Sequence, residues 1–378
     1  MKASKSKRIL FLVNGNGEDS IAASIISKLP KDILVDAFPI IGFGNAYKNI
    51  CPIVGPRLFI PSQGHRQAGS IAKDIKGGMI LGTWKTIKFL RSIKGQYDKI
   101  IAVGDSVTPF LCFFAGLKID IYLDVYKNGY AHKYSKLERW VIKKTAKKVY
   151  NRDDILASSL RQVGVDAISK GNIMLDLTPF GKYDVMPYRQ KKYIIILLPG
   201  SRKTTAKNLK IQLDAIRKLP KEIIPDIFVA VANDISLDEL ANETSMKYYE
   251  AKTNNKADLG YLSDGEINLN LTFGVAGNII EEADLLLSQA ATLTLQALGM
   301  GKPVISFIEK HDREKRIADR KKLAGQSRIF TSQNIDELAK ATKNLLLDKK
   351  ERKKMGEIGK IRIGTKGTLK AVLKDISS

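Results

Sequence analysis

Cysteine and histidine are scarce in this chain of 378 residues. Two cysteines, Cys51 and Cys112, are too few for a disulfide framework, and their number fits a reducing compartment. The three histidines have no cysteine or carboxylate around them at a spacing that resembles a metal site. We therefore expect neither a disulfide scaffold nor a bound metal.

Long apolar runs are also missing, and none approaches the roughly 20 residues of a membrane-spanning helix. The first run, Ile9–Val13, leads directly into a glycine-rich turn, so it predicts a β-strand and not a signal peptide. Hydrophobic residues still make up 44% of the chain and charged residues 27%, as in a soluble globular protein. The length favours two domains. We expect a cytoplasmic protein.

Acidic residues are few relative to basic ones, with 39 Asp and Glu against 63 Lys and Arg and a net charge of +24. Such a charge favours anionic partners. Two basic segments with interleaved apolar residues, Met79–Lys94 and Lys133–Tyr150, are typical of helices that lie at an anionic membrane surface. The alternative is that they pack on their own sheet with solvated lysines. No nucleic-acid-binding module surrounds them, so no nucleic-acid partner is expected.

Apolar strands followed by glycine-bearing turns and helices recur along the chain. Ile9–Val13 leads into the turn Asn14–Asp19 and a helix, and Lys99–Val103 ends at Gly104 and Asp105. In a doubly wound sheet, ligands bind beyond the carboxyl ends of the strands. The first turn is neither a dinucleotide fingerprint nor a P-loop, because it lacks the third glycine and a Gly-Lys-Ser/Thr. The alternatives are a tight structural turn at Asn14–Asp19 and a helix cap at Asp105.

The second half of the chain repeats this pattern. The apolar strand Tyr193–Leu198 ends in Pro199-Gly200-Ser201-Arg202, and Leu285–Leu287 precedes small polar residues and an apolar helix. Such helix starts present backbone N–H groups and a positive dipole end to an anion. Thr178–Lys192 has the composition of a linker. We therefore expect domains at residues 1–180 and 181–348, and basic helices over 349–378 whose packing on the first domain is left open.

The order of these motifs, from about Ile9 to Leu347, resembles that of lipid-A-disaccharide synthase and, more closely, of the lipid-A-disaccharide-synthase-related proteins of cyanobacteria. The motifs are Gly15-Asn16-Gly17-Glu18-Asp19, Val103-Gly104-Asp105, Gly171–Asp176, Leu198–Arg202 and Ala290–Pro303. The resemblance implies the GT-B fold, an α/β architecture of two Rossmann-like domains with an interdomain cleft. It also implies an inverting, metal-independent and cofactor-free transfer of an N-acetylglucosamine-type sugar from a UDP-sugar to an anionic glycolipid.

Residue roles follow from the same resemblance. Asp105 matches the family's candidate general base. The candidate substrate- and nucleotide-binding residues are Gly15, Gly17, Glu18, Asp19, Asn172, Gly200, Ser201, Arg202, Ala291, Thr292 and Gln296. The resemblance places the acceptor at the N-terminal domain, the UDP-sugar mainly at the C-terminal domain, and the protein peripherally on the inner membrane surface. Helix N-termini and an arginine then offset the charge of the departing diphosphate.

Three positions depart from the family's pattern. Ala291 stands where the family has glycine, and Leu295 or Gln296 stands where it has an acid that accepts from ribose hydroxyls. The usual glutamate is also missing near Thr205. Losing a charge-assisted acceptor costs about 1.5–3 kcal/mol. Two alternatives to a transferase follow, namely a nucleotide-sugar-binding relative with weak or no activity, and a UDP-sugar epimerase on the same fold. Donor sugar, acceptor lipid and oligomeric state stay open.

Overall fold

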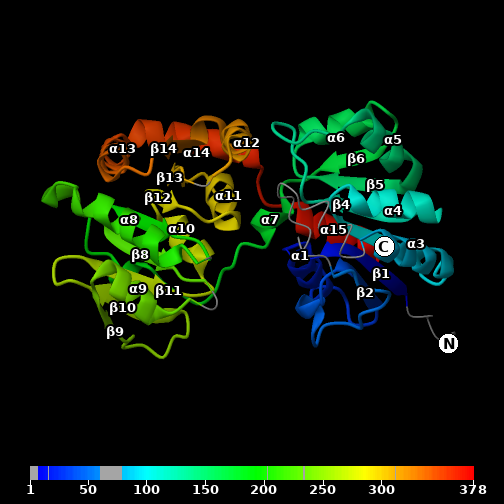
Figure 1. The fold of residues 1–378 in the computed structure, drawn as a ribbon, viewed down its shortest axis with the longest axis horizontal. Coiled ribbons are helices and arrows are strands. Elements are labelled where there is room, and N and C mark those ends of the chain that lie inside the picture. The colour runs from blue at the N-terminus through cyan, green and yellow to red at the C-terminus, as the bar shows by residue number, and fades with distance from the viewer. Residues whose placement is uncertain (1–6, 16, 60–78, 202, 233–234, 311) are drawn as a thin grey trace. The chain divides into compact units, whose positions relative to one another are not determined.

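The computed structural model describes residues 7–15, 17–59, 79–201, 203–232, 235–310 and 312–378. The chain forms two compact units, Met1–Leu177 together with Lys366–Ser378, and Thr178–Thr365. Each unit is a sheet with helices on both faces (Figure 1). The basic C-terminal segment is divided between them, since helix α14 belongs to the second unit and helix α15 to the first.

The first unit is a six-stranded parallel sheet with the order β2-β1-β3-β4-β5-β6. Its elements are β1 (Arg8–Gly15), α1 (Gly17–Ile26), β2 (Leu34–Ile41), η1 (Asn45–Tyr47), α3 (Met79–Ser92), β3 (Lys99–Gly104), α4 (Val107–Ala115), β4 (Ile119–Asp124), α5 (Lys136–Thr145), β5 (Ala146–Asn151), α6 (Asp154–Arg161), β6 (Asp166–Ser169), α7 (Ile173–Asp176) and α15 (Thr368–Ser377). Strand β1 is fully buried from Ile9 to Val13, as parallel strands covered on both faces are.

Helices α3, α4, α5 and α6 pack on one face of this sheet, and α1, α7 and α15 pack on the other. Helix α15 contributes to the core between this sheet and α1 and α7, since Val372 and Ile376 are fully buried there. Asp375 on the same helix accepts from Tyr150 Oη at 2.7 Å and pairs with Lys148 at 2.6 Å. The end of the chain therefore completes the first unit after the chain has built the second.

The basic segment Lys133–Tyr150 is helical only in part. Helix α5 ends at Thr145, and the next six residues form strand β5 between β4 and β6. Val149 enters the core on one face of the sheet and Tyr150 the core on the other. Lys147 pairs with Asp120 of β4 at 2.7 Å. Pairing with two neighbouring strands thus decides the structure of a segment whose lysines suggested one long helix.

The second unit is an eight-stranded sheet with the order β14-β13-β12-β7-β8-β11-β10-β9, parallel except that β10 is antiparallel to β9 and β11. Its elements are η2 (Met186–Tyr188), β7 (Ile194–Leu198), α8 (Thr205–Arg217), η3 (Lys221–Ile223), β8 (Asp226–Ala230), α9 (Leu237–Thr244), β9 (Lys247–Tyr249), β10 (Asp258–Ser263), β11 (Asn268–Thr272), α10 (Ala276–Glu282), β12 (Leu285–Ser288), α11 (Thr292–Gly299), β13 (Val304–Phe307), α12 (Glu314–Ala324), η4 (Gly325–Ser327), β14 (Arg328–Thr331), α13 (Ile335–Leu347) and α14 (Lys349–Ile363).

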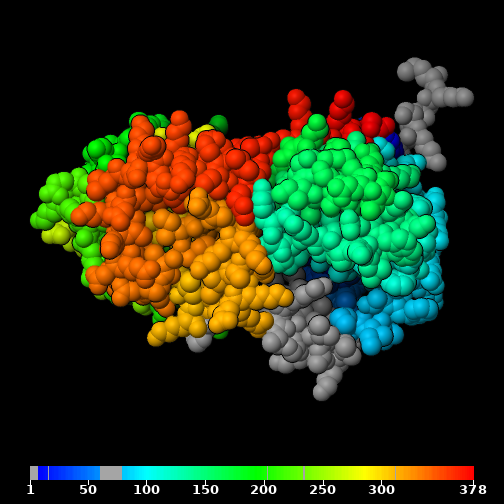
Figure 2. Space-filling view, turned by 90° about the horizontal axis from the view of Figure 1, so that it is seen from above, coloured from blue at the N-terminus to red at the C-terminus, as the bar shows by residue number. Residues whose placement is uncertain are grey.

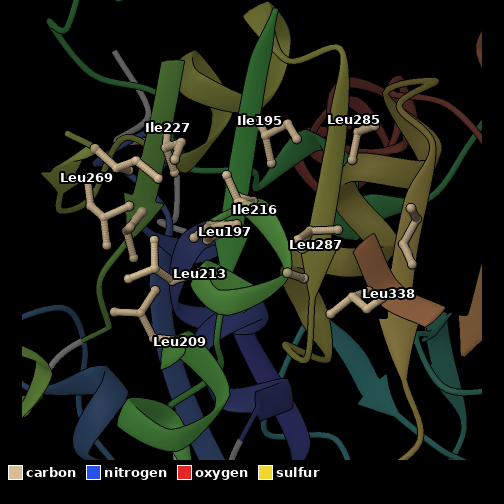
Figure 3. Packing of buried hydrophobic residues seen from close by; sticks show 14 of the residues in the cluster. Ile195, Leu197, Leu209, Leu213, Ile216, Ile227, Leu269, Leu285, Leu287 and Leu338 are labelled. Carbon is tan, nitrogen blue, oxygen red and sulfur yellow. The ribbon is translucent and has the colours of Figure 1, made fainter. Parts of the chain in front are cut away.

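Strand β7 lies at the centre of this sheet and is buried along its length. Its side chains alternate between two cores, as successive residues of a strand must. Ile195 and Leu197 meet Leu213 and Ile216 of α8 (Figure 3). The side chain of Ile196 and its neighbours of the same parity enter the opposite core, which is formed with α10, α11 and α14. The ends of β7 are therefore held rigidly.

We expect Ile376→Ala to lower the free energy of unfolding of the first unit by about 2–4 kcal/mol, because it leaves a cavity in a filled core. Both tryptophans, Trp84 and Trp140, lie in this unit, so tryptophan fluorescence during chemical denaturation reports on it alone. Lys374→Ala, on the exposed side of the same helix, is the matched control. Equal midpoints for the two variants would contradict a structural role for α15.

Candidate functional site

The strand order of the first unit reverses at β1. The chain passes from β1 to β2 on one side and later places β3 on the other side. At such a switch point the loops after the two strands diverge and leave room for a ligand. The two loops here are those that follow Gly15 and Gly104, and they carry most of the residues predicted for the first domain.

These loops bring Asn14, Glu18 and Asp105 together. Asn14 Nδ2 donates to Asp105 Oδ1 at 3.3 Å. A Cβ atom on Gly104 would lie 3.0 Å from Asn14 Cβ and 3.8 Å from Glu18 Cγ, so both side chains stand against the backbone beside Asp105. Asp105 Oδ1 also accepts from the N–H of Val107 at 2.8 Å. The predicted base therefore lies at the switch point and also bonds the first residue of α4, whose N-cap residue is Ser106.

The carboxyl of Glu18 has an unusual environment. Burial raises its pKa to about 7, and the negative charges of Asp105 and Asp19 add to this rise. A carboxyl with a pKa near neutrality both accepts and releases a proton readily. The sequence predicted Glu18 as a binding residue only, since no local signal shows that the fold places it against Asp105.

Other residues of the same turn have structural roles. Asp19 is buried and accepts from Tyr47 Oη at 2.9 Å, which fixes η1 against α1. Gly15 has a φ of +122°, and a Cβ there would lie 2.5 Å from the carbonyl oxygen of Ile41. A Cβ on Gly17, in contrast, would meet no described atom within 4 Å. The open part of this turn is therefore at Gly17, the first residue of α1.

Asn172 lies apart from this cluster in the fold. It follows β6, which is separated from β3 by β4 and β5. Its side chain is buried and accepts from the N–H of Met174 at 3.1 Å, so it caps α7. The carbonyl oxygen of the preceding Gly171 accepts from Thr368 Oγ1 at 2.7 Å. These contacts explain the residue as an anchor for α7 and α15.

A second layer of polar residues behind Asp105 was not found from the sequence. Ser106 Oγ donates to Glu138 Oε1 at 2.7 Å, and Lys127 pairs with the same carboxylate at 2.7 Å. Although burial acts to raise the pKa of Glu138, the hydrogen bonds from Lys127, Ser106 and Ser135 hold it at about 2. This ionised carboxylate joins the start of α4 to α5. Asp124 ends β4 and accepts from the N–H of Lys127 at 2.9 Å, so a carboxylate at a strand end was a sequence signal for this layer.

The second unit has its own switch point, between β7 and β12. The N–H groups of Gln289 and Ala290 both donate to the carbonyl oxygen of Leu198, at 2.8 and 3.3 Å, which ties the two loops together. Gly200 has a φ of +108°, a conformation that favours glycine. The predicted residues Gly200 and Ser201 lie on the loop after β7.

Helices α8 and α11 begin at this switch point, and neither has a side-chain hydrogen bond at its N-cap. Six other helices of the described chain have such a cap, from Ser135, Asp153, Asn172, Ser236, Asn334 and Asp348. Ser201, Ala291 and Thr292 are exposed here. Both helix starts thus direct a positive dipole end toward this switch point, and the exposed start of α11 also offers backbone N–H donors to an anion. Arg202 lies outside the described residues.

Gln296 is the exception among the predicted residues of α11. It is 3% exposed, whereas Ala291 and Thr292 at the start of the helix are open. An acid missed from the sequence lies nearby, because Glu309 Oε1 accepts from Asn208 Nδ2 at 3.2 Å and from Gln289 Nε2 at 3.5 Å. Asn208 also donates to the carbonyl oxygen of Pro199 at 3.0 Å. Asn208 therefore links the loop after β7 to Glu309.

The described part of the chain has neither a membrane-spanning helix nor a metal-binding cluster. None of its helices has both the length and the apolar composition needed to cross a bilayer. It also contains no cluster of three or more His, Cys, Asp or Glu side chains arranged to hold a metal ion.

The chain matches no protein-family model and no curated protein sequence. Its fold matches many solved structures. An S. aureus MnaA–UDP co-structure has 15% identity over 98% of this chain and 96% of its own, with a TM-score of 0.57. Acinetobacter baumannii MurG has 13% identity over 97% and 98%, with a TM-score of 0.57. Phytolacca americana UGT2, complexed with UDP-2-fluoro-glucose and pterostilbene, has 11% identity over 99% of both chains, with a TM-score of 0.56.

Other matches include a UDP-N-acetylglucosamine 2-epimerase and the glycosyltransferase SnogD from Streptomyces nogalater. These matches include both epimerases and glycosyltransferases, and what they share is the GT-B fold, which consists of two Rossmann-like α/β domains. The predicted fold class is therefore confirmed.

Glu18→Gln tests the environment of the carboxyl cluster through stability. The pKa of Glu18 is about 7 in the folded chain and about 4.5 when unfolded, so the folded state favours the protonated form. The contribution of protonated Glu18 to the stability of the fold is fully present below pH 4.5 and is lost as the pH rises through 7. We expect the free energy of unfolding of Glu18→Gln to exceed that of the wild type by about 1–3 kcal/mol at pH 8 and by little at pH 4.

Denaturation followed by tryptophan fluorescence at both pH values measures this difference. Asp32→Asn, an exposed carboxyl of the same unit, is the control, and it should show no comparable pH dependence. A stability gain for Glu18→Gln that is equal at pH 4 and pH 8 would rule out a buried, repelled carboxyl.

Proposed function

We propose that this protein is a glycosyltransferase similar to lipid-A-disaccharide synthase, which transfers an N-acetylglucosamine-type sugar from a UDP-sugar to the hydroxyl of a membrane glycolipid. The observation that carries the proposal is the division of chemistry between two switch points. The first unit presents the carboxyls of Glu18 and Asp105, and the second presents two uncapped helix N-termini. Structural neighbours that contain UDP or a UDP-sugar analogue support the nucleotide part of this proposal.

The proposed reaction is a single displacement that inverts the anomeric centre. The acceptor oxygen forms a bond to C1 of the sugar, its proton passes to the carboxyl cluster at Asp105, and the bond from C1 to the diphosphate breaks. The electron pair leaves with UDP. In this scheme the positive ends of α8 and α11, together with Ser201 and Arg202, hold the negative charge of the diphosphate. No metal or organic cofactor takes part in this scheme.

A UDP-sugar epimerase is the second candidate. It is favoured by the structural neighbours of that class, among them the Neisseria meningitidis UDP-GlcNAc 2-epimerase bound to UDP-GlcNAc, which has a TM-score of 0.54. The cluster of two carboxyls would also serve it, since epimerisation needs proton transfer at carbon. The two candidates differ in their products. UDP-GlcNAc incubated without acceptor yields an epimer in one case and remains intact in the other.

Release of UDP from a panel of UDP-sugars, with lipid extract as the acceptor, tests the transferase. We expect Asp105→Ala to lower turnover by about 10²–10⁴-fold, the usual range for removal of a group that assists proton transfer. Asp98→Ala, just before the opposite end of β3, is the control and should remain active. Full activity of Asp105→Ala, or no turnover with any donor, would refute the proposal. Tight UDP binding without turnover would favour the inactive relative.

The proposal of a lipid acceptor is supported by one surface of the first unit, which we call the aromatic–basic face. Its exposed apolar residues are Ile80, Leu81 and Trp84 on α3, Phe114 on α4, and Leu137 and Trp140 on α5. Arg91 donates to the carbonyl oxygen of Phe114 at 2.9 Å, and the rings of Phe113 and Trp140 are 5.0 Å apart, so the three helices form one surface. Helices α3 to α5 lie at the surface of the unit, coloured cyan to green (Figure 2).

The charged residues on this face suit an anionic bilayer. Lys85 and Lys88 on α3, and Lys136, Lys143 and Lys144 on α5, are exposed. Aromatic side chains bind at the headgroup level, and each lysine near an anionic surface contributes about 1 kcal/mol. Helix α4 starts directly after Asp105 and Ser106. A membrane bound at this face would therefore bring lipid headgroups near the unit that carries the carboxyls.

We expect Trp84→Ser to weaken sedimentation with vesicles that contain anionic phospholipid by about threefold or more, because it removes a large apolar group from the interface. Ile361→Ser, which removes an equally exposed apolar side chain from the second unit, should bind as the wild type does. Binding should also fall as salt is raised. Equal binding of both variants, or retention by RNA and not by vesicles, would refute the membrane face.

A further inference from the structure

Helices α5 and α6 border a groove that shares no lining residue with the two switch points. Its volume is about 590 Å³, which is within the range of sites that bind small molecules. The two helices are neighbours on one face of the first sheet (Figure 1), and they begin at its carboxyl edge because α5 follows β4 and α6 follows β5. The described lining residues come from these two helices and from the chain directly next to them.

The groove has an excess of positive charge. Lys133 and Arg139 line it, and Asp154 is the one carboxylate among its described lining residues. That carboxylate is already neutralised, since Asp154 pairs with Arg161 at 2.9 Å and accepts from Ser158 Oγ at 3.3 Å. An anion that enters the groove therefore meets two cations and one acid that is already paired.

The guanidinium of Arg139 lies at the groove without a protein partner. Within the described chain it forms no ion pair and donates no hydrogen bond. Its Nε is buried while the residue as a whole is half-buried, so the two Nη groups are the accessible donors. A guanidinium presents such groups as a planar fork that matches two oxygens of a phosphate. Because the inner end of the side chain is already buried, less of its freedom is lost when a ligand binds.

The other lining residues suit an amphiphilic ligand. Ile155 on the first turn of α6 is 44% exposed, and Tyr134 and Leu156 are further apolar parts of the lining. The amide of Gln162, which is also exposed, adds a neutral donor. An inorganic anion leaves the exposed apolar side chain in water, whereas a phosphate that carries glycerol and acyl chains covers it.

Helix α5 connects this groove to the aromatic–basic face. Leu137 and Trp140 lie on the flank of α5 that faces α4, where the rings of Trp140 and Phe113 are 5.0 Å apart. Arg139 lies on the flank that faces α6. A helix with its side chains is about 10–12 Å wide, so a bilayer in contact with Trp140 brings its headgroups to within about that distance of the groove.

We propose that the groove between α5 and α6 binds the phosphate of an anionic phospholipid, with Arg139 as the residue that binds two of its oxygens. Lys133 adds charge attraction, and Ile155 contacts the glycerol and the first carbons of the acyl chains. The site rests on the membrane association proposed above, and it is independent of the sugar transfer. It adds recognition of one headgroup to the general attraction between lysines and an anionic surface.

Isothermal titration calorimetry of the full-length protein tests the site with soluble short-chain lipids, which exclude partition into a bilayer. The probe is dihexanoyl phosphatidylglycerol below its critical micelle concentration. We expect saturable binding of this lipid, and binding of dihexanoyl phosphatidylcholine about tenfold weaker, because its choline brings a cation toward Lys133 and Arg139. Inorganic phosphate should also bind less tightly, since it makes no apolar contact with Ile155.

Three variants locate the binding. Arg139→Gln should lower the affinity for phosphatidylglycerol by about tenfold or more, because it removes a charge-assisted pair of hydrogen bonds. Lys28→Gln, directly after α1 on the opposite face of the sheet, removes an equal charge from an exposed position and should bind as the wild type does. Asp154→Asn removes the carboxylate from the groove and should raise the affinity several-fold, a gain that misfolding cannot produce.

The outcomes separate this site from general surface charge and from the proposed function. Equal losses for Arg139→Gln and Lys28→Gln, or no gain for Asp154→Asn, would reduce the effect to surface charge and overturn the site. Inorganic phosphate that binds as tightly as phosphatidylglycerol would make an inorganic anion the occupant and overturn the lipid. Failure of the transferase assay with every donor would refute the sugar transfer alone, because the calorimetry needs no UDP-sugar.

Discussion

Both candidate sites depend on the burial of one central strand in each unit. Strands β1 and β7 are paired on both edges and covered on both faces, and their apolar residues are almost completely inaccessible to solvent. Nothing polar fits inside such a strand, so the first polar residues occur where the strand ends and the loops diverge. The strand then acts as a rigid support for Asn14 and Glu18 in one unit and for Gly200 and Ser201 in the other.

The two units use this support for different chemistry. The first gathers carboxyls, with donors around Asp105 and repulsion around Glu18. The second has two uncapped helix starts, and its acid Glu309 is bound by Asn208 and Gln289. Proton transfer needs the first arrangement, and stabilisation of a departing diphosphate needs the second. In the sugar transfer that we propose, each unit would supply one of these two arrangements.

The last helix shows how little of this organisation is local. Val372 and Ile376 fill a core whose strands were completed some two hundred residues earlier in the chain, and Asp375 bonds with Tyr150 and Lys148 of β5. The sequence of this C-terminal segment indicates only basic helices with a weak apolar stripe. The apolar residues of α15 are needed because they cover one face of the first sheet, which the sequence of the helix does not reveal.

The sequence by itself determined the repeated strand–turn–helix units, the glycine turns after β1 and β7, and the position of Asp105 at a strand end, because these signals lie within a few residues of one another. Tertiary structure alone decided that a strand follows Thr145, that Gln296 is buried, and that Glu18 stands beside Asp105. The physical reason is that pairing, burial and charge repulsion act between residues far apart in the chain. A carboxyl acquires its chemistry from those distant neighbours, and not from the residues next to it.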